Sequence, residues 1–480
     1  MLLSGCDIGS GTKVPITDSR NCFPKDAQHW IAKSKEAGQL HSVAVPTAAR
    51  KATVYVDHSG SMVGYIAGGT NLERPLQDLI ATIPSSLKTV GIDTALRSFG
   101  TKVSDELPDA GKQLLRAEAY VCKAADRAAC DNSESRLDTV LGQVASQNDD
   151  LAIIVSDLWF SNSDIQSTGI AALQPMLTDL LFKDKVIAIY GIDAPFAGKI
   201  YDLPQAGNGS ISVPYQGRHP LYVMVVGSKR AVIDFDSALA SSGSNSLAEG
   251  AKSGRIMRSV FTVDPGPLEY NQKQPLIGGS KQTRLHQENF EIPTGVSIQR
   301  FVMTAGLPEK SGKVPPASPQ WVGPDPSGFL ANAVWIGPLA TQTRVWKQTS
   351  KACSATSWIE QKSDQTSQIG WLADSGNGQM TFQLDPNKFA ATLLTEGVYM
   401  IVGETKRLSV TQPNPATQWM RGAWNLNPAQ AEAAARSTPP TFPTLNLSEF
   451  GRIMEGALAA AAERKNQPLV GFAVLVKVDN

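Results

Sequence analysis

Apolar residues follow two kinds of pattern from Lys51 onwards. Short apolar runs alternate with stretches in which apolar residues recur every three or four positions. The short runs are typical of buried strands, and the wider spacing is typical of amphipathic helices. We therefore expect strands at 52–56, 92–99, 151–155, 186–192 and 221–226, and helices at 71–87, 137–144, 165–182 and 229–240. Strands that alternate with helices indicate an α/β domain with a parallel sheet and helices on both faces.

The pattern changes after about Arg255. Helical periodicity fades, Pro and Gly become frequent, and seven of the nine tryptophans lie between Trp321 and Trp424. We expect strands at 333–336, 381–384 and 397–402, separated by turns, which indicates a β-rich, sandwich-like region. A Pro-rich linker at 437–443 then leads into an amphipathic helix at 447–464 and a final strand at 469–478.

These patterns divide the chain into four expected parts. Residues 1–49 form an N-terminal segment and tether with one short helix near 27–37. An α/β domain occupies 50–245, a β-rich region occupies 256–436, and a helix–strand unit occupies 444–480.

Composition excludes several classes of protein. With 42% hydrophobic residues and no net charge, the 480-residue chain differs from disordered chains, which are polar and highly charged. The balance of 44 basic and 44 acidic residues provides no electrostatic footprint for nucleic acid, so we expect no nucleic-acid partner. No stretch approaches the roughly 18 apolar residues that a membrane-spanning helix requires.

The most informative segment runs from Val54 to Met62. Asp57 ends a predicted buried strand, and Ser59 and Ser61 follow on the loop into a helix. At the carboxyl end of a parallel strand, such groups converge on the crevice where α/β proteins bind ligands. One carboxylate and two hydroxyls are hard oxygen donors, which suit Mg²⁺ or Mn²⁺.

This D-x-S-x-S arrangement, with its flanking strand and helix, resembles the metal-ion-dependent adhesion site of von Willebrand factor A (VWA) domains. The family's site also contains a Thr on a second loop and an Asp at the end of a later strand. Asp157 follows the predicted strand 151–155 and matches that Asp. Leu158 and Trp159 stand where the family often has Gly, which indicates a more hydrophobic rim.

Two threonines are candidates for the remaining ligand. Thr139, at the start of the helix before that strand, has the expected place in the chain order, and Asp138 beside it is an alternative to Thr139. Thr70 lies in a Gly-Gly-Thr-Asn-Leu segment that looks more like the family's Thr loop, but it follows Ser61 by only nine residues. We favour Thr139.

The resemblance covers about residues 48–245 and implies a Rossmann-like domain with a metal site. Ser59, Ser61 and Thr139 would touch the ion, and Asp57 and Asp157 would hold it directly or through water. One coordination position would stay open for a carboxylate of a protein partner. The implied function is adhesion or scaffolding that depends on a divalent cation, without catalysis.

Other interpretations of the same residues remain open. A second D-x-S-x-S match, from Asp131 to Ser135, lies in a polar loop without a preceding apolar run, and we interpret it as unrelated to the metal. Asp57 and Asp157 can also act simply as caps of helices and turns. A metal-dependent hydrolase would use the same oxygen ligands to activate water, with His58 as its one candidate base. A structural or carbohydrate-binding envelope protein would instead rely on the Trp-rich region, although buried aromatic anchors explain such a region more often.

The N-terminus and the cysteines indicate a compartment. The segment from Leu3 to Cys6 resembles the bacterial lipobox, in which Cys6 becomes lipid-modified, although no charged and apolar signal region precedes it. The resemblance implies a protein of the bacterial cell envelope that is attached to the membrane only through lipid and faces the periplasm or the exterior.

Four further cysteines carry no zinc-like spacing. Cys122 and Cys130 flank a short polar loop, and we expect them to form a disulfide. Cys22 and Cys353 either pair with each other or remain free thiols. A disulfide would fit an oxidising compartment.

Overall fold

The computed structural model describes a large part of the chain. The described residues are 22–40, 50–70, 73–122, 130–147, 150–161, 169–205, 209–241, 256–263, 269–270, 283–287, 298–305, 320–323, 336–351, 354–361, 370–374, 380–384, 395–410, 414–437, 439–465 and 471–479. The predicted lipidation site Cys6 lies outside them.

A six-stranded mixed sheet forms the centre of the α/β part, with strand order β2-β1-β3-β5-β4-β6. The strands are β1 Arg50–Asp57, β2 Ile92–Phe99, β3 Leu151–Ser156, β4 Val186–Gln205, β5 Gly209–Gly227 and β6 Ile256–Phe261. β1 pairs in parallel with both β2 and β3, so the carboxyl ends of these strands lie at one edge of the sheet. The protein is therefore mixed α/β.

The expectation of a wholly parallel sheet is wrong for the second half. β5 is antiparallel to both β3 and β4, and β6 is antiparallel to β4. β4 and β5 form one long hairpin that runs from the pair Val186–Gly227 to the pair Gln205–Gly209. The short apolar runs at 186–192 and 221–226 mark only the buried base of this hairpin. Its outer part is more exposed, so it carries no continuous apolar run.

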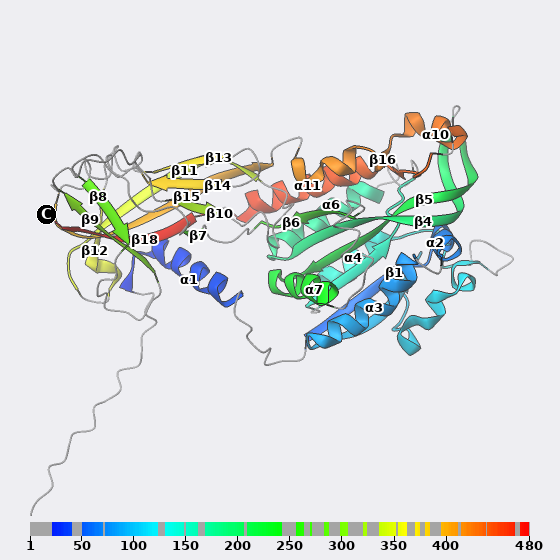
Figure 1. The fold of residues 1–480 in the computed structure, drawn as a ribbon, viewed down its shortest axis with the longest axis horizontal. Coiled ribbons are helices and arrows are strands. Elements are labelled where there is room, and N and C mark those ends of the chain that lie inside the picture. The colour runs from blue at the N-terminus through cyan, green and yellow to red at the C-terminus, as the bar shows by residue number, and fades with distance from the viewer. Residues whose placement is uncertain are drawn as a thin grey trace, which may run out of the picture.

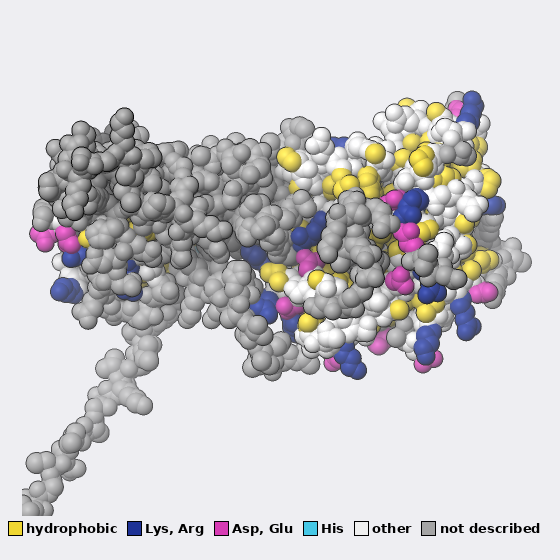
Figure 2. All heavy atoms as spheres, in the orientation of Figure 1, with side chains coloured by type: hydrophobic (Ala, Val, Ile, Leu, Met, Phe, Trp, Pro, Cys, Tyr) yellow, Lys and Arg dark blue, Asp and Glu magenta, His cyan; other side chains and the backbone are white. Residues whose placement is uncertain are grey.

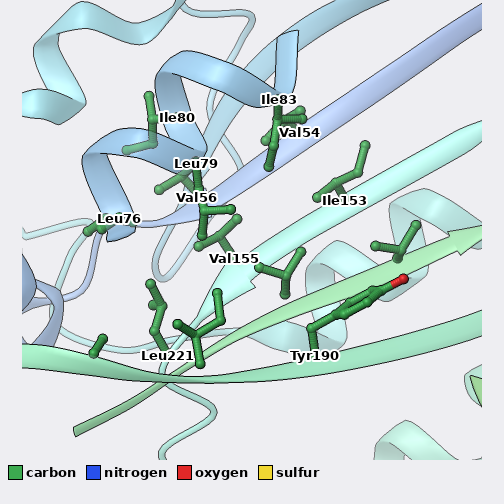
Figure 3. Packing of buried hydrophobic residues seen from close by; sticks show 14 of the residues in the cluster. Val54, Val56, Leu76, Leu79, Ile80, Ile83, Ile153, Val155, Tyr190 and Leu221 are labelled. Carbon is green, nitrogen blue, oxygen red and sulfur yellow. The ribbon is translucent and has the colours of Figure 1, made fainter. Parts of the chain in front are cut away.

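Helices cover both faces of this sheet. Successive side chains of a strand point to opposite faces, so neighbouring residues of one strand pack against different helices. Val54 and Val56 pack with one set of helices, α3 (Pro75–Thr89) and α7 (Lys229–Ser241). Figure 3 shows Leu76, Leu79, Ile80 and Ile83 of α3 above β1 and β3. Tyr55 points the other way and belongs to the cluster that contains α4 (Leu137–Ser146) and α6 (Gly169–Phe182).

A second six-stranded sheet has the order β12-β11-β15-β18-β9-β8. Its strands are β8 Thr283–Gln287, β9 Gln299–Ala305, β11 Ile336–Gln348, β12 Trp358–Glu360, β15 Gly397–Val410 and β18 Gly471–Asp479. A four-stranded sheet has the order β13-β14-β10-β7, with β7 Glu269–Tyr270, β10 Gln320–Gly323, β13 Gly370–Asp374 and β14 Met380–Leu384. A two-stranded ladder pairs β16 (Asn425–Leu426) with β17 (Thr444–Leu445).

The C-terminal elements join the two large sheets. Helix α11 (Leu447–Lys465) packs against α6 on the first sheet and against β15 of the second. Its apolar residues lie in one cluster with residues of both sheets, and Figure 1 shows the helix running between them. β18 lies inside the second sheet, between β15 and β9, while β6 belongs to the first sheet. The last strand of the chain therefore lies in the same sheet as β9, β11 and β15.

The N-terminal helix α1 (Lys25–Leu40) is longer than expected and is docked rather than part of a tether. Ala27, Trp30 and Ile31 are buried in a cluster with Met400 and Leu475 of the second sheet. The Trp30 indole also donates a hydrogen bond to Glu404 on β15. Cys22, three residues before this helix, is buried in the same cluster, with 3% of its surface exposed.

Short helical segments complete the described chain: η2 Gly60–Met62, α2 Val63–Gly68, η3 Pro108–Leu115, η4 Ala117–Tyr120, η6 Ala355–Ser357, η8 Pro415–Arg421, η9 Pro428–Gln430 and α10 Ala431–Ser437. Trp346 and Trp358 are buried, and Trp419 and Trp424 pack against the core, so these four act as aromatic anchors. Figure 2 shows basic and acidic side chains interspersed on the visible face, in keeping with zero net charge. Among the described helices, none has the length and apolar character needed to cross a membrane.

Candidate metal centre

The carboxyl ends of β1 and β3 bring two acidic residues to the same edge of the first sheet. Asp57 is the last residue of β1, and Asp157 follows directly after β3. The two strands are adjacent and parallel, with Val56 opposite Val155. Both side chains are almost fully buried, with 0% and 1% of their surface exposed. The chain-order argument from the sequence therefore places the two carboxylates where the structure has them.

The Asp57 carboxylate accepts three hydrogen bonds. The backbone N–H of Ser59 donates to Oδ1 over 2.8 Å, which fixes the loop after β1. The hydroxyls of Ser135 and Ser156 both donate to Oδ2, over 2.7 Å and 2.8 Å. Ser156 is the last residue of β3, whereas Ser135 belongs to the loop before α4. Three separate chain segments thus hold this carboxylate in one orientation.

The loop that carries Ser135 lies between two other loops of the site. The N–H of Gly60 donates to the Asn132 carbonyl over 3.2 Å, and the N–H of Thr101 donates to the Asp131 carbonyl over 2.7 Å. Gly100 permits this close approach, because a Cβ there would lie 1.9 Å from the Asp131 carbonyl oxygen. The loop is therefore held by backbone hydrogen bonds on both sides.

This arrangement corrects our interpretation of the second D-x-S-x-S segment. We expected Asp131–Ser135 to be unrelated to the site, but its last residue, Ser135, contacts Asp57 directly. Its first residue, Asp131, is exposed and contributes its backbone carbonyl to the loop contacts. We set this segment aside because no apolar run precedes it. That criterion was wrong, because the loop reaches Asp57 through tertiary contacts and not from the end of a strand.

Asp157 has one oxygen that is satisfied and one that is not. The N–H of Trp159 donates to Oδ1 over 3.2 Å. Oδ2 is buried and has no hydrogen-bond partner among the described residues. The Ser61 hydroxyl is near enough to lower the pKa of Asp157, and it also lies 3.0 Å from the Ser59 hydroxyl. Two hydroxyls and one unsatisfied carboxylate oxygen thus gather beside Asp57.

Burial makes both carboxylates difficult to ionise. Desolvation, together with the nearby charge of Asp157, raises the pKa of Asp57 from 3.8 to about 6, against the lowering effect of the hydrogen bonds from Ser135 and Ser59. Desolvation also raises the pKa of Asp157. Within the described parts of the chain, no Lys, Arg or His forms an ion pair with either side chain. Among the described residues, therefore, no basic side chain forms an ion pair that would balance this buried pair of acids.

The other predicted ligands, Thr139, Asp138 and Thr70, interact with residues other than Asp57 and Asp157. The N–H of Thr139 donates to the Arg136 carbonyl within the first turn of α4, and Asp138 pairs with the Arg136 guanidinium. The Thr70 hydroxyl accepts a hydrogen bond from the N–H of Glu73, so it helps to form the turn before α3. Among the described hydrogen bonds, none joins these three side chains to Asp57 or Asp157. Ser135, which precedes α4 by two residues, is the hydroxyl that reaches the site from this part of the chain.

Aromatic residues and the C-terminal chain form one wall of the centre. The Trp159 ring lies 5.7 Å from the His219 ring and 6.5 Å from the Phe442 ring, measured between centroids. Burial lowers the pKa of His219 to about 4, and its Nδ1 lies 2.7 Å from the Phe442 carbonyl oxygen. The Asn446 side chain donates to the Phe160 carbonyl, three residues beyond Asp157. From the sequence we expected a hydrophobic rim only from Leu158 and Trp159. His219, Phe442 and Asn446 could not be anticipated, because they come from distant segments of the chain.

The donor set fits a small hard cation. Among the described ranges, no group of three or more His, Cys, Asp or Glu side chains is arranged to bind a metal, so any site here would combine the two carboxylates with neutral oxygens. Mg²⁺ is commonly bound by one or two carboxylates together with neutral oxygens and water. Asp57, Asp157, Ser59, Ser61 and Ser135 offer that combination, and the unpartnered Oδ2 of Asp157 is an oxygen that a cation would satisfy.

A disulfide bond lies just before the loop that carries Ser135. Cys122 and Cys130 form a disulfide with a Cα–Cα distance of 5.7 Å, within the ordinary range. Cys22 is also disulfide-bonded, so the free-thiol alternative does not hold for it, and Cys353 lies outside the described residues. Since Cys130 directly precedes the Asp131–Ser135 segment, the first disulfide restrains one end of the loop that reaches Asp57.

No protein-family model matches the chain, and no curated protein matches it either.

Proposed function

We propose that this protein binds a divalent cation, Mg²⁺ or Mn²⁺, between Asp57 and Asp157 and uses it to capture an acidic residue of a protein partner. The observation that carries the proposal is the pair of buried carboxylates, which has an unpartnered oxygen and no basic side chain in ion-pair contact within the described residues. Leaving charge buried without a partner is costly, and a divalent cation would compensate it.

The hydroxyls of Ser59, Ser61 and Ser135 would complete the protein's ligands. Ser135 takes the role that we expected for Thr139, because its hydroxyl is the one in contact with Asp57. Neutral hydroxyl ligands leave net positive charge on a bound ion, so an outside carboxylate would bind there strongly. The protein's own residues would position the ion, with the Trp159 ring packed against His219 on one side, and would leave one coordination position for a partner's carboxylate.

We further propose that the α/β part is a VWA-like domain. Support comes from the parallel core β2-β1-β3, from Asp57 and Asp157 at neighbouring strand ends, and from the helical turn that follows Ser59. The antiparallel strand β5 within the sheet departs from a simple Rossmann-like order. We also propose a bacterial envelope location with a lipid anchor on Cys6, which the bonded state of Cys22, Cys122 and Cys130 supports, since disulfides persist in oxidising compartments.

Isothermal titration calorimetry with Mg²⁺ tests the metal site. We expect wild-type protein to bind Mg²⁺ and Asp57→Asn to lose at least about a hundredfold in affinity, or about 2.7 kcal/mol. Asp131→Asn is a matched control, because Asp131 opens the second D-x-S-x-S segment but is exposed. Undiminished Mg²⁺ affinity in Asp57→Asn would refute the metal assignment.

Partner binding tests the function. Immobilised protein should retain an envelope protein in Mg²⁺ and release it in EDTA, and Asp57→Asn should retain it in neither buffer. The captured protein should then bind wild type and Asp131→Asn equally when it is purified. A purified partner that binds equally well in EDTA would exclude cation-dependent adhesion even if the metal site is real.

A further inference from the structure

A pocket of about 890 Å³ adjoins the proposed metal centre. Its lining consists of His58, Ser98, Gln113, Leu114, Arg116, Glu118 and Ala119. His58 stands in the chain between two residues of the centre, Asp57 and Ser59, and Ser98 on β2 pairs with Val56 on β1. The 3-10 helices η3 and η4 supply the other wall. A partner bound at the metal centre would therefore lie beside this pocket.

Contacts of Tyr120 connect the pocket wall with the metal centre. The Tyr120 hydroxyl donates to the Leu114 carbonyl over 2.9 Å, and Leu114 lines the pocket. On the other side, the Asn132 side chain donates to the Tyr120 carbonyl, and the N–H of Gly60 donates to the Asn132 carbonyl. The pocket wall and the loop of Ser59 and Ser61 are thus parts of one hydrogen-bonded structure.

Arg116 supplies positive charge to the pocket lining, beside the neutral polar side chains of Ser98 and Gln113. The Arg116 side chain is exposed and forms no ion pair among the described residues, and the Gln113 amide is exposed beside it. The Nδ1 of His58 is buried and has no hydrogen-bond partner within the described ranges. Glu118 contributes negative charge to the lining, so the balance favours a single carboxylate over a polyanion such as phosphate.

We infer that this pocket binds a second carboxylate of the same acidic partner segment, next to the carboxylate that would complete the metal site. The inference rests on the proposed function for the position of the first carboxylate. Arg116 is suited to the second, because a guanidinium binds a carboxylate through two parallel hydrogen bonds. The pocket thereby selects partners that present two acidic residues close together over partners that present one.

Blocked synthetic peptides provide the test. One peptide contains a single Glu among Ala and Gly, and a series contains two Glu residues separated by one to four positions. In Mg²⁺, we expect the best two-Glu peptide to bind wild-type protein roughly tenfold more tightly than the one-Glu peptide, as an added hydrogen bond between charged groups provides. Arg116→Gln should abolish this advantage, and Arg116→Lys should retain part of it. Lys112→Gln is the control, because it removes an exposed positive charge from η3 outside the pocket lining.

The readouts separate the two proposals. If the two-Glu advantage persists in Arg116→Gln, or is missing in wild-type protein, the pocket assignment is wrong and the metal assignment stands. If the one-Glu peptide binds equally in Mg²⁺ and in EDTA, the metal-dependent function is wrong, and the Arg116 dependence of the two-Glu peptide still decides the pocket. Failure of every two-Glu peptide to bind wild-type protein at millimolar concentration would also overturn the pocket assignment.

Discussion

The Ser135 hydroxyl donates a 2.7 Å hydrogen bond to Oδ2 of Asp57, although 78 residues separate the two in the chain. Ser156 donates to the same oxygen from the neighbouring strand. The carboxylate is therefore oriented by hydroxyls from two independent segments before any ion binds. Such preorganisation lowers the conformational cost of forming a metal site.

The hydroxyl of Ser135, rather than that of Thr139, should determine metal affinity. We expect Ser135→Ala to weaken Mg²⁺ binding roughly tenfold, because it removes a neutral ligand and a hydrogen bond to Asp57 worth about 1.5 kcal/mol. Thr139→Ala should leave Mg²⁺ affinity within about twofold of wild type, the range of a surface substitution. Calorimetry on both variants measures this, and the reverse order would restore Thr139 as the ligand.

The raised pKa of Asp57 should make the metal-free protein less stable as the pH rises. The fold favours the protonated carboxyl, so this contribution to stability is present below pH 4 and is lost as the pH rises through about 6. The rise in pKa from 3.8 to about 6 corresponds to about 3 kcal/mol at 1.36 kcal/mol per pH unit. Urea unfolding in EDTA measures this. Between pH 4 and pH 7.5, the free energy of unfolding of Asp57→Asn should rise by that amount relative to that of wild type.

Mg²⁺ should offset most of this difference at pH 7.5. At a concentration one hundred times its dissociation constant, a ligand of the folded state stabilises it by about 2.7 kcal/mol. Wild-type protein should gain that stability, and Asp57→Asn should gain none. Equal pH dependence of the two proteins in EDTA would show that Asp57 is ionised without cost in the fold.

Gly100 should be indispensable for the loop that carries Ser135. A Cβ at this position would lie 1.9 Å from the Asp131 carbonyl oxygen, and because that atom belongs to the backbone it cannot move aside as a side chain would. Gly100→Ala should therefore cost about 1–3 kcal/mol in the free energy of unfolding and should weaken Mg²⁺ binding. Gly142→Ala on α4 is the control, because the nearest atom to its Cβ would be 4.0 Å away. Unchanged Mg²⁺ affinity in Gly100→Ala would separate the loop contact from the metal site.

Cys122 and Cys130 should be bonded in protein recovered from its native compartment. Mass spectrometry of non-reduced peptides should find the linked pair, and the double variant Cys122→Ser/Cys130→Ser should lose about 2.5 kcal/mol, the loop-closure value for so short a loop. The variant should also bind Mg²⁺ more weakly, since Cys130 directly precedes the Asp131–Ser135 segment. Two free thiols in the native protein would remove this support for an exported protein.

The ion pair between Arg421 and Glu455 should hold helix α11 in place. Glu455 is fully buried, and its Oε2 lies 2.5 Å from the Arg421 guanidinium. Arg421→Leu should destabilise the protein by about 3 kcal/mol, because it leaves a buried charge without its partner. Arg452→Leu on the same helix is the control, since its pair with Glu449 is exposed and is worth at most about 1 kcal/mol. Urea unfolding compares the two, and equal losses would show that Arg421 contributes no more than an exposed residue.

The sequence by itself determined the local elements of the α/β part and the two acids of its site. The apolar runs marked β1, β2 and β3, and the helical spacing marked α3, α4 and α7, because side-chain periodicity is a property of each element alone. Asp57 and Asp157 were identifiable because each lies at the carboxyl end of a buried apolar run, and parallel neighbouring strands end at one edge.

Only the tertiary structure decided which strands pair and which hydroxyls meet the acids. The order β3-β5-β4 depends on the pairing of the long hairpin, which short apolar runs do not specify. Ser135 reaches Asp57 because Gly100 and Gly60 hold its loop from both sides, and the wall of His219 and Phe442 forms because the C-terminal chain returns to the first sheet. These contacts join residues far apart in sequence, and no local pattern encodes such contacts.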